Sequence, residues 1–332
     1  MPATPATLVD GFGRTVRDLR VSVTDRCNFR CTYCMPAEGM VWQDRAELLT
    51  FEEMTRIVGI CTSRLGVDGV RLTGGEPTVR AHLPVLVQQL ASLPVRPDLA
   101  MTTNGAALRL MAEDLRAAGL DRINISCDSL RADRFAEITR RDSLAAVLDG
   151  IDAAKSAGFD PVKINCVLMR GVNDDEIVDF ARFGREQGVT IRFIEFMPLD
   201  ADDRWQRGSV VPSQEVLEQV AATFPIEAIA HGPEPASRFR YTDGAGEVGV
   251  IASVTQPFCA SCDRVRLTAD GQFRTCLFAI DETDLRAVVR GGGSDDDLEA
   301  AIRTAVGNKW AGHQIGNVTF VRPPRSMSQI GG

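Results

Sequence analysis

The sequence has no excess of positive charge. Its 332 residues include 37 Lys and Arg against 45 Asp and Glu, which gives a formal net charge of −8. A protein that binds DNA or RNA regardless of sequence needs a basic face that displaces counterions from the phosphates. We therefore expect no nucleic-acid partner, and any cations that matter to function should be local.

Long apolar runs are also missing. No stretch reaches the roughly 18 consecutive apolar residues that a membrane-spanning helix requires. The N-terminal stretch MPATPATLVDGFGR has no apolar signal-peptide core, so we expect a cytoplasmic protein with no membrane partner. With 44% hydrophobic and 25% charged residues, the chain can form one large or two modest globular domains.

Histidine is scarce, whereas cysteine is not: the chain has three histidines and nine cysteines. In a cytoplasmic chain, cysteines are metal ligands or core thiols more often than disulfides. Three of them stand alone in apolar surroundings and are interpreted as small buried side chains: Cys61, Cys127 and Cys166. The other six form two triplets, with spacings C-x3-C-x2-C and C-x2-C-x13-C: Cys27, Cys31, Cys34 and Cys259, Cys262, Cys276.

Each triplet is one donor short of the four that a closed zinc site needs. Completion by one of the three histidines, His82, His231 or His313, would make either triplet a structural zinc site. An iron-sulfur cubane can instead be held by three thiolates, which leaves one iron open to a small ligand. Composition alone leaves both alternatives open for both triplets.

Short β-rich runs alternate with segments of helical periodicity from Leu19 to about Leu199. Six strands are expected, beginning at Leu19, Gly69, Leu99, Arg122, Val162 and Ile191. Helical segments lie between them, and several end at a glycine suited to a C-cap. Six βα units predict a parallel sheet covered by helices, either a curved partial barrel or a flat doubly wound sheet.

The pattern changes after Pro198. A polar linker precedes an amphipathic helix near Ser213 to Phe224, and β-rich segments follow, with a hairpin at LTADGQFRTCLF and a helix start at Ser294 or Asp295. This predicts a parallel α/β domain over residues 1–200 and a smaller α+β domain over residues 201–332. The closing RSMSQIGG has the composition of a disordered tail.

Unusual residues follow the expected strands. The first cysteine triplet, Gly74-Gly75-Glu76-Pro77, Thr102 to Gly105, Ser126 to Ser129 and Met197-Pro198 each lie just after or at the end of one. The carboxyl ends of parallel strands carry the active site in such architectures, so one mouth should collect nearly all of these residues. The paired glycines form either a tight structural turn or a place where a ligand approaches the backbone.

Four cations interrupt otherwise apolar strands: Arg20, Arg71, Lys163 and Arg192. Period-two alternation places them on the same strand faces as polar residues, for example Arg71 with Thr73. A buried cation needs an anion nearby, because leaving it unpaired costs several kcal/mol. The four cations indicate either ion pairs with neighbouring carboxylates or a polyanionic ligand such as a nucleoside triphosphate.

Taken together, these motifs resemble the GTP 3',8-cyclase family of molybdenum cofactor biosynthesis, within the radical S-adenosylmethionine (SAM) superfamily. The stretches that carry the resemblance occur in the family's order: DRCNFRCTYCMP, RLTGGEP, TTNG, NISCDS, RFIEFMPLD, FCASCDRVRLTADG and the closing IGG. The resemblance implies an α/β fold, an incomplete (βα)6 TIM-type barrel with a smaller C-terminal α+β domain. It also implies conversion of GTP to (8S)-3',8-cyclo-7,8-dihydroguanosine 5'-triphosphate, by abstraction of the ribose 3' hydrogen and bond formation to guanine C8.

The resemblance further implies roles for individual residues. Two 4Fe-4S clusters would be held by the first triplet, Cys27, Cys31 and Cys34, and by the second triplet, Cys259, Cys262 and Cys276. SAM would be contacted by Tyr33, Gly75, Ser126 and Met197. GTP would be bound by Arg20, Arg71, Thr102, Lys163, Arg264 and Arg266, with Arg192 at its phosphates, and the Gly331-Gly332 pair would enter the active site.

The same resemblance implies a homodimer, a cyclic pyranopterin monophosphate synthase as the downstream partner and an electron donor that the sequence does not identify. Three positions depart from the family's usual pattern: Gly69 precedes Arg71 where some relatives have a lysine, Cys127 replaces a common leucine, and Ala81-His82 replaces an arginine-aspartate pair. Two alternatives compete with this interpretation, a radical SAM peptide maturase and a zinc-stabilised binding protein.

Overall fold

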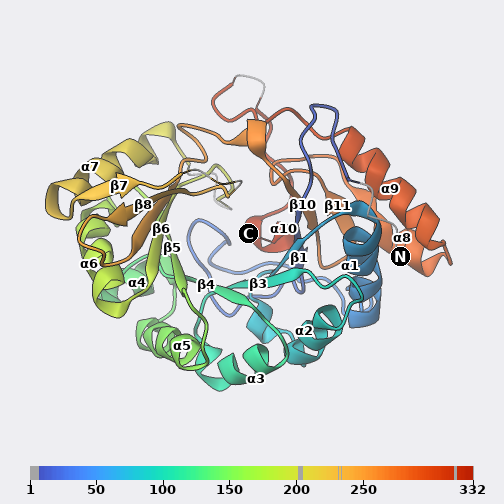
Figure 1. Ribbon diagram of the computed structural model, residues 1–332, viewed down its shortest axis with the longest axis horizontal. Coiled ribbons are helices and arrows are strands. Elements are labelled where there is room, and N and C mark those ends of the chain that lie inside the picture. The colour runs from blue at the N-terminus through green and yellow to red at the C-terminus, as the bar shows by residue number, and fades with distance from the viewer. Residues whose placement is uncertain (1–6, 201–204, 231, 233, 318–319, 332) are drawn as a thin grey trace.

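The computed structural model describes residues 7–200, 205–230, 232, 234–317 and 320–331. Twelve strands of these residues form one sheet, in the order β12-β11-β10-β1-β2-β3-β4-β5-β6-β9-β8-β7. The sheet curls around a central space, and the larger helices cover its outer side (Figure 1).

The central strands of the sheet, from β10 to β9, are all parallel to one another. They are β1 (Asp18–Ser22), β2 (Gly69–Thr73), β3 (Asp98–Thr103), β4 (Arg122–Ser126), β5 (Lys163–Leu168), β6 (Thr190–Glu195), β9 (Glu247–Ile251) and β10 (Arg264–Leu267). Antiparallel strands extend both edges: β11 (Gln272–Arg274), β12 (Thr283–Asp284), β7 (Ile226–Ala228) and β8 (Ser237–Tyr241).

The helices are α1 (Phe51–Leu65), α2 (Leu83–Ala91), α3 (Ala112–Ala117), α4 (Ala132–Thr139), α5 (Leu144–Ser156), α6 (Ile177–Gln187), α7 (Ser213–Thr223), α8 (Leu285–Arg290), α9 (Asp295–Gly307) and α10 (Met327–Ile330). Local sequence explains several boundaries. Thr50 and Glu53 form a capping box at the start of α1, and Gly66 ends it in the left-handed conformation. Ser294, one of two expected N-caps, forms the capping box of α9 with Asp297.

The main core lies between the sheet and its covering helices. Every second strand residue contributes to it, for example Leu19 and Val21 in β1 and Ile164 in β5, all fully buried. Because strand side chains alternate between faces, the intervening residues face the central space of the barrel. These are the polar and cationic positions of the sequence.

The six expected N-terminal strands are confirmed, and they pair in sequence order, as an incomplete (βα)6 barrel requires. The helix near Ser213 and the hairpin formed by β10 and β11 are confirmed as well. The C-terminal segment adds β10 beside β1 and β9 beside β6, so the sheet continues past residue 200 on both edges. The division into domains at that residue stays a prediction.

One expectation from composition is wrong. The tail is not disordered, because Met327–Ile330 form α10 and Ile330 is 1% exposed. Among the described residues, none of the helices is both long and apolar enough to span a membrane.

Candidate active site

The first cysteine triplet lies in the loop that follows β1. The paired glycines after β2 pack directly against this loop: a Cβ on Gly75 would lie 2.3 Å from the Arg26 carbonyl oxygen, and one on Gly74 would lie 2.6 Å from that of Thr24. The Gly75 N–H also donates to Thr24 O at 2.8 Å. Glycine is therefore required here for close packing, whatever ligand the turn also contacts.

Glu76 joins three segments around this loop. Its carboxylate accepts hydrogen bonds from the Thr103 hydroxyl and from the Asn104 backbone N–H, each at 2.6 Å. The Asn104 side chain in turn donates to Asn28 Oδ1 at 2.7 Å, within the cysteine loop. Burial raises the pKa of Glu76, although its hydrogen bonds oppose this shift. Sequence reasoning did not assign Glu76 this role.

The thiols of the first triplet are buried enough to resist ionisation. Burial raises the pKa of Cys27 to about 11 and that of Cys34 to about 12, and it raises the pKa of Cys31 well above its usual value. A thiolate in such a place requires a cationic partner. The donor set therefore fits a positively charged iron core, which three thiolates can hold.

Tyr33, between two of these cysteines, is oriented by a buried carboxylate. Its hydroxyl donates to Asp128 Oδ2 at 2.6 Å, and Asp128 Oδ1 accepts from the Val167 N–H at 2.8 Å. Burial raises the pKa of Asp128 to about 6. Ser126 ends β4 and Met197 follows β6, so both lie at the same strand ends as Tyr33. The predicted SAM contacts thus share one end of the barrel.

The second triplet lies at the opposite end. Cys262 precedes β10, whose first residue Arg264 pairs with Asp18, the first residue of the parallel strand β1. Cys27, by contrast, follows the last residue of β1. The expectation of one mouth concerned the first triplet and the loops after the N-terminal strands; the second triplet lies elsewhere, because Cys262 precedes its strand instead of following it.

Cations surround Cys262. Arg264 Nη2 lies 3.6 Å and Lys309 Nζ 3.9 Å from its Sγ, and Lys309 also donates to the Arg264 carbonyl at 2.5 Å. Burial raises the pKa of Cys262, but Arg264 and Lys309 outweigh it, so the net shift is downward. Arg14 donates to the Cys259 carbonyl at 2.7 Å and fixes the start of the triplet. These contacts favour an anionic thiolate at this position.

The zinc alternative requires donors around a single ion. Within the part of the chain that the structure describes, three or more His, Cys, Asp or Glu side chains never gather in a way that could hold one metal ion. His313 is engaged elsewhere: Nε2 lies 2.9 Å from Ser253 O, and Nδ1 accepts from the Ile315 N–H. His231 lies outside the described residues.

Three arginines form a row across the inner face. In the strand register, Arg20 lies between Arg266 on β10 and Arg71 on β2. Neighbouring strands are about 4.8 Å apart, so like charges at one level repel unless an anion lies between them. Further along the sheet, Thr102, Asn124 and Lys163 form a second row, since Thr102 pairs with Asn124 and Asn124 with Lys163.

Burial lowers the pKa of these cations. The pKa of Arg71 falls to about 9 and that of Lys163 to about 8, and in each case a neighbouring arginine adds to the effect of burial. The pKa values of Arg20, Arg192 and Arg266 are lowered by burial as well. Among the described residues, neither Arg71 nor Lys163 has a carboxylate within ion-pair distance, and the Asp18 carboxylate lies 3.8 Å from Arg20 Nε, too far for a hydrogen bond. The site is therefore short of anions.

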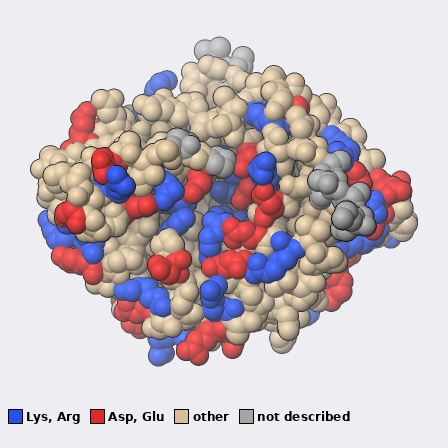
Figure 2. Space-filling view, viewed as in Figure 1, with Lys and Arg blue, Asp and Glu red and all other residues tan. Residues whose placement is uncertain are grey.

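Lys163 and Arg192 line a cavity of about 470 Å³. Its walls come from the starts of β5 and β6 and from the segment around β8 and β9. Arg192 Nη2 forms an ion pair with Glu234 at 2.6 Å. On the face in Figure 2, basic and acidic side chains gather around the centre of the molecule.

The C-terminal tail enters the barrel between the two triplets. Arg325 binds Asp270 and Glu282, each at 2.9 Å, and holds the start of α10. Burial raises the pKa of the Cys34 thiol, and the nearby backbone of Ser328 in the tail opposes this rise. At the other end of α10, the Gly331 carbonyl accepts a hydrogen bond from Arg266. Gly332 lies outside the described residues.

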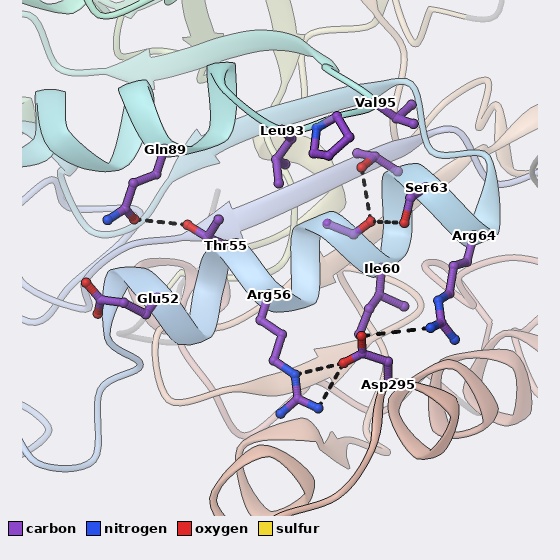
Figure 3. A pocket seen from close by; sticks show the side chains of 13 residues that line it. Glu52, Thr55, Arg56, Ile60, Ser63, Arg64, Gln89, Leu93, Val95 and Asp295 are labelled. Atoms are coloured by element: carbon purple, nitrogen blue, oxygen red, sulfur yellow. Dashed lines mark hydrogen bonds and ion pairs between the residues drawn. The ribbon is translucent and has the colours of Figure 1, made fainter. Parts of the chain in front are cut away.

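A second cavity, of about 490 Å³, lies on the outer side of the sheet between α1 and α2 (Figure 3). Its polar side chains satisfy one another: Arg56 pairs with Asp295 at 2.9 Å, and Thr55 donates to Gln89 at 3.0 Å. None of its lining residues belongs to the predicted site.

Comparison with known proteins gives two family matches and many close relatives. Residues 21–184 match the Radical SAM superfamily, and residues 189–315 match the family described as Molybdenum Cofactor Synthesis C. The GTP 3',8-cyclase of Streptomyces coelicolor is 49% identical over 98% of this chain and 96% of its own length. That of Mycobacterium sp. (strain KMS) is 51% identical over 100% of this chain and 95% of its own length.

Solved structures share the fold at low identity. Streptococcus suis SuiB bound to S-adenosylmethionine superposes with a TM-score of 0.62 at 14% identity, over 88% of this chain and 69% of that one. The anSMEcpe enzyme with bound AdoMet gives a TM-score of 0.55 at 15% identity, over 80% of this chain and 77% of that one. Both likenesses support the partial barrel with its C-terminal extension.

Proposed function

This chain belongs to the GTP 3',8-cyclase family, and from that premise we propose how its residues divide the conversion of GTP to (8S)-3',8-cyclo-7,8-dihydroguanosine 5'-triphosphate. The reaction is the first step of molybdenum cofactor biosynthesis, and as a radical SAM protein the chain uses a 4Fe-4S cluster and SAM. The observation that carries the division of roles is the separation of the two cysteine triplets to opposite ends of a cation-lined barrel.

At the carboxyl ends of the strands, Cys27, Cys31 and Cys34 hold the first cluster. When bound there, the cluster and SAM supply the radical chemistry that removes a hydrogen atom from the GTP ribose. The SAM contacts come from Tyr33, Gly75, Ser126 and Met197. Asp128 fixes the Tyr33 ring, and Glu76 fixes the cysteine loop against Thr103 and Asn104. These buried hydrogen bonds keep the site rigid and exclude water from it.

At the opposite end, Cys259, Cys262 and Cys276 would hold a second 4Fe-4S cluster, which would bind the guanine base. Lys309 and Arg264 place positive charge beside Cys262, which stabilises the thiolate. The inner-face cations between the two ends bind the ribose and the triphosphate: Arg20, Arg71, Lys163, Arg192, Arg264 and Arg266, with Thr102. Base and ribose are thereby held within reaction distance.

Entry of the closing glycine pair into the active site is supported by Gly331, which lies beside Thr73 and whose carbonyl accepts from Arg266. A homodimer, a cytoplasmic setting, an external electron donor and a cyclic pyranopterin monophosphate synthase that receives the product complete the proposal. Because Gly69 stands where some relatives have a lysine, the phosphate site has one cation fewer than in those relatives.

An anaerobic turnover assay tests these roles. Protein reconstituted with iron and sulfide is mixed with SAM, a reductant and GTP, and 5'-deoxyadenosine and residual GTP are quantified by chromatography. Cys27→Ala should lose both SAM cleavage and GTP consumption. Cys276→Ala should retain SAM cleavage and lose GTP consumption. The matched control Cys61→Ala, which alters a buried thiol of α1 outside both triplets, should keep both activities.

Two results would contradict the division of roles. One is GTP consumption by Cys276→Ala at the rate of the unaltered protein. The other is SAM cleavage by Cys27→Ala.

A further inference from the structure

Glu234 lies beside one of the inner-face cations and lines the same cavity as another. Its Oε2 is 2.6 Å from Arg192 Nη2, and its charge opposes the fall in the pKa of Lys163 that burial and Arg192 cause. The Arg192 side chain is 7% exposed, whereas that of Glu234 is 39% exposed. A buried guanidinium is thus neutralised by a carboxylate that solvent can reach.

The other carboxylates of the cavity form no ion pair with Arg192 or Lys163 among the described residues. Glu247 accepts from Arg238 Nε at 3.0 Å and from its Nη2 at 2.7 Å, across the β8–β9 pair. Asp160, which also lines the cavity, forms no ion pair within the described residues. Glu234 therefore pairs closely with Arg192 and, at 3.9 Å, with Arg238, while Lys163 has no carboxylate within ion-pair distance among the described residues, so positive charge exceeds negative charge around Glu234.

We propose that Glu234 occupies a phosphate position of the GTP site in the nucleotide-free enzyme and is displaced by the triphosphate, so that it sets the affinity for this part of the substrate. The inference rests on the proposed function and deepens it. A carboxylate and a phosphate present similar oxygen acceptors to a guanidinium. With its Oε2 at 2.6 Å from Arg192 Nη2, Glu234 takes the donor that a phosphate oxygen would need.

The position of Glu234 permits displacement. It lies outside any helix or strand, three residues before β8 begins at Ser237. The Glu234 side chain is exposed enough to move into solvent, and a phosphate oxygen in its place leaves the buried guanidinium of Arg192 paired. A triphosphate brings more negative charge than one carboxylate and can reach both cations at once. Glu234 thus neutralises part of the positive charge of the cavity in the nucleotide-free enzyme. Only an anion of higher charge displaces it.

Inorganic triphosphate is the probe that separates this inference from the proposed function, because it contains no guanine. Its dissociation constant, and that of GTP, are measured by calorimetry with the anaerobic holoprotein, its Glu234→Gln variant and a Glu247→Gln control. The control removes the same charge from the same cavity without touching Arg192. We expect Glu234→Gln to bind triphosphate about tenfold more tightly, or about 1.4 kcal/mol, and Glu247→Gln to change it by far less.

A double variant completes the test. When Arg192→Met is present, Glu234→Gln should no longer tighten triphosphate binding, because the competition requires Arg192. Unchanged or weaker triphosphate binding by Glu234→Gln would overturn the inference, as would an equal gain in the Glu247→Gln control. If triphosphate binding tightens while GTP binds no better than triphosphate itself, the anion site and the role of Glu234 stand, and guanine recognition in the proposed function fails.

Discussion

Replacing Gly331 with alanine tests whether the C-terminal tail is docked in the barrel as the structure has it. Gly331 has φ +81°, and a Cβ at this position would lie 2.6 Å from Thr73 Oγ1 and 3.2 Å from the Ser22 Cβ. The substitution therefore combines an unfavourable backbone conformation with a steric conflict against two strand residues that face the barrel interior.

Each contribution has a known scale. The left-handed conformation costs an alanine about 1–2 kcal/mol, and overpacking against β1 and β2 adds about 1–3 kcal/mol. The docked tail is held by the buried side chain of Ile330, whose burial contributes about 1.5–3 kcal/mol, and by the bond from Arg266 to Gly331. The penalty is comparable with the docking energy, so Gly331→Ala should release the tail while the barrel stays folded.

Hydrogen exchange followed by mass spectrometry measures this release. Residues 326–331 should lose protection by a factor of about 30 or more, equivalent to about 2 kcal/mol, with the barrel strands unaffected. The matched control is Gly292→Ala: Gly292 has φ +79° but no atom within 4 Å of the added Cβ. Adding Thr73→Ala to Gly331→Ala should restore part of the protection, because it removes the closest atom. Full protection of the tail in Gly331→Ala would refute the docked position.

Two further predictions follow from buried polar groups. Tyr33→Phe removes the donor to Asp128 and should lower the free energy of unfolding, measured in urea, by about 1.5–3 kcal/mol. The control Tyr241→Phe removes a hydroxyl that has no partner among the described residues and should lower it by much less. Equal losses in the two variants would contradict the role of Asp128. Burial, with Arg192 second, lowers the pKa of Lys163 to about 8, below its unfolded value of about 10.4. Between these pH values the unfolded chain binds more protons than the folded chain, so the free energy of unfolding without nucleotide should rise with pH. Over the same range Lys163 loses its positive charge in the folded protein, so the affinity for triphosphate should fall. Lys163→Arg should flatten the fall in affinity measured by calorimetry, and a wild-type affinity that is constant from pH 7 to 9.5 would refute the assignment.

Local patterns in the sequence predict the frame of this molecule well. Alternation in β1 separates Leu19, in the core, from Arg20, on the inner face, because period two is a property of the strand itself. The capping box at Ser294 is equally local, since its partners are three residues apart. The first cysteine triplet is recognised from eight residues of one loop, Cys27 to Cys34.

Residues whose partners lie far away in the chain escape such reasoning. Glu76 meets Thr103 across 27 positions, Arg192 meets Glu234 across 42, and Tyr33 meets Asp128 across 95. That a buried carboxylate accepts hydrogen bonds from several segments becomes clear only when the strand ends around it are known. The resemblance to a family named the ligand positions but did not name these supporting carboxylates.

The second triplet shows the same limit in its placement. Its cysteines are plain in the sequence, but their position at the amino ends of the strands depends on β10 docking parallel to β1. The tail is similar: composition favours disorder for RSMSQIGG, whereas Asp270 and Glu282, which pair with Arg325 of this segment, and Arg266, which donates to Gly331, come from other segments and hold it in place.

The central claim is that the two triplets hold two separate iron-sulfur cores, one at each end of the barrel. The most direct measurement is the iron, sulfide and zinc content of anaerobically prepared protein. Two cubanes predict about eight irons and eight sulfides per chain, and about four of each when either triplet is changed to alanine. One zinc per chain with no iron, or an iron content that falls to zero when the second triplet alone is removed, would contradict the account.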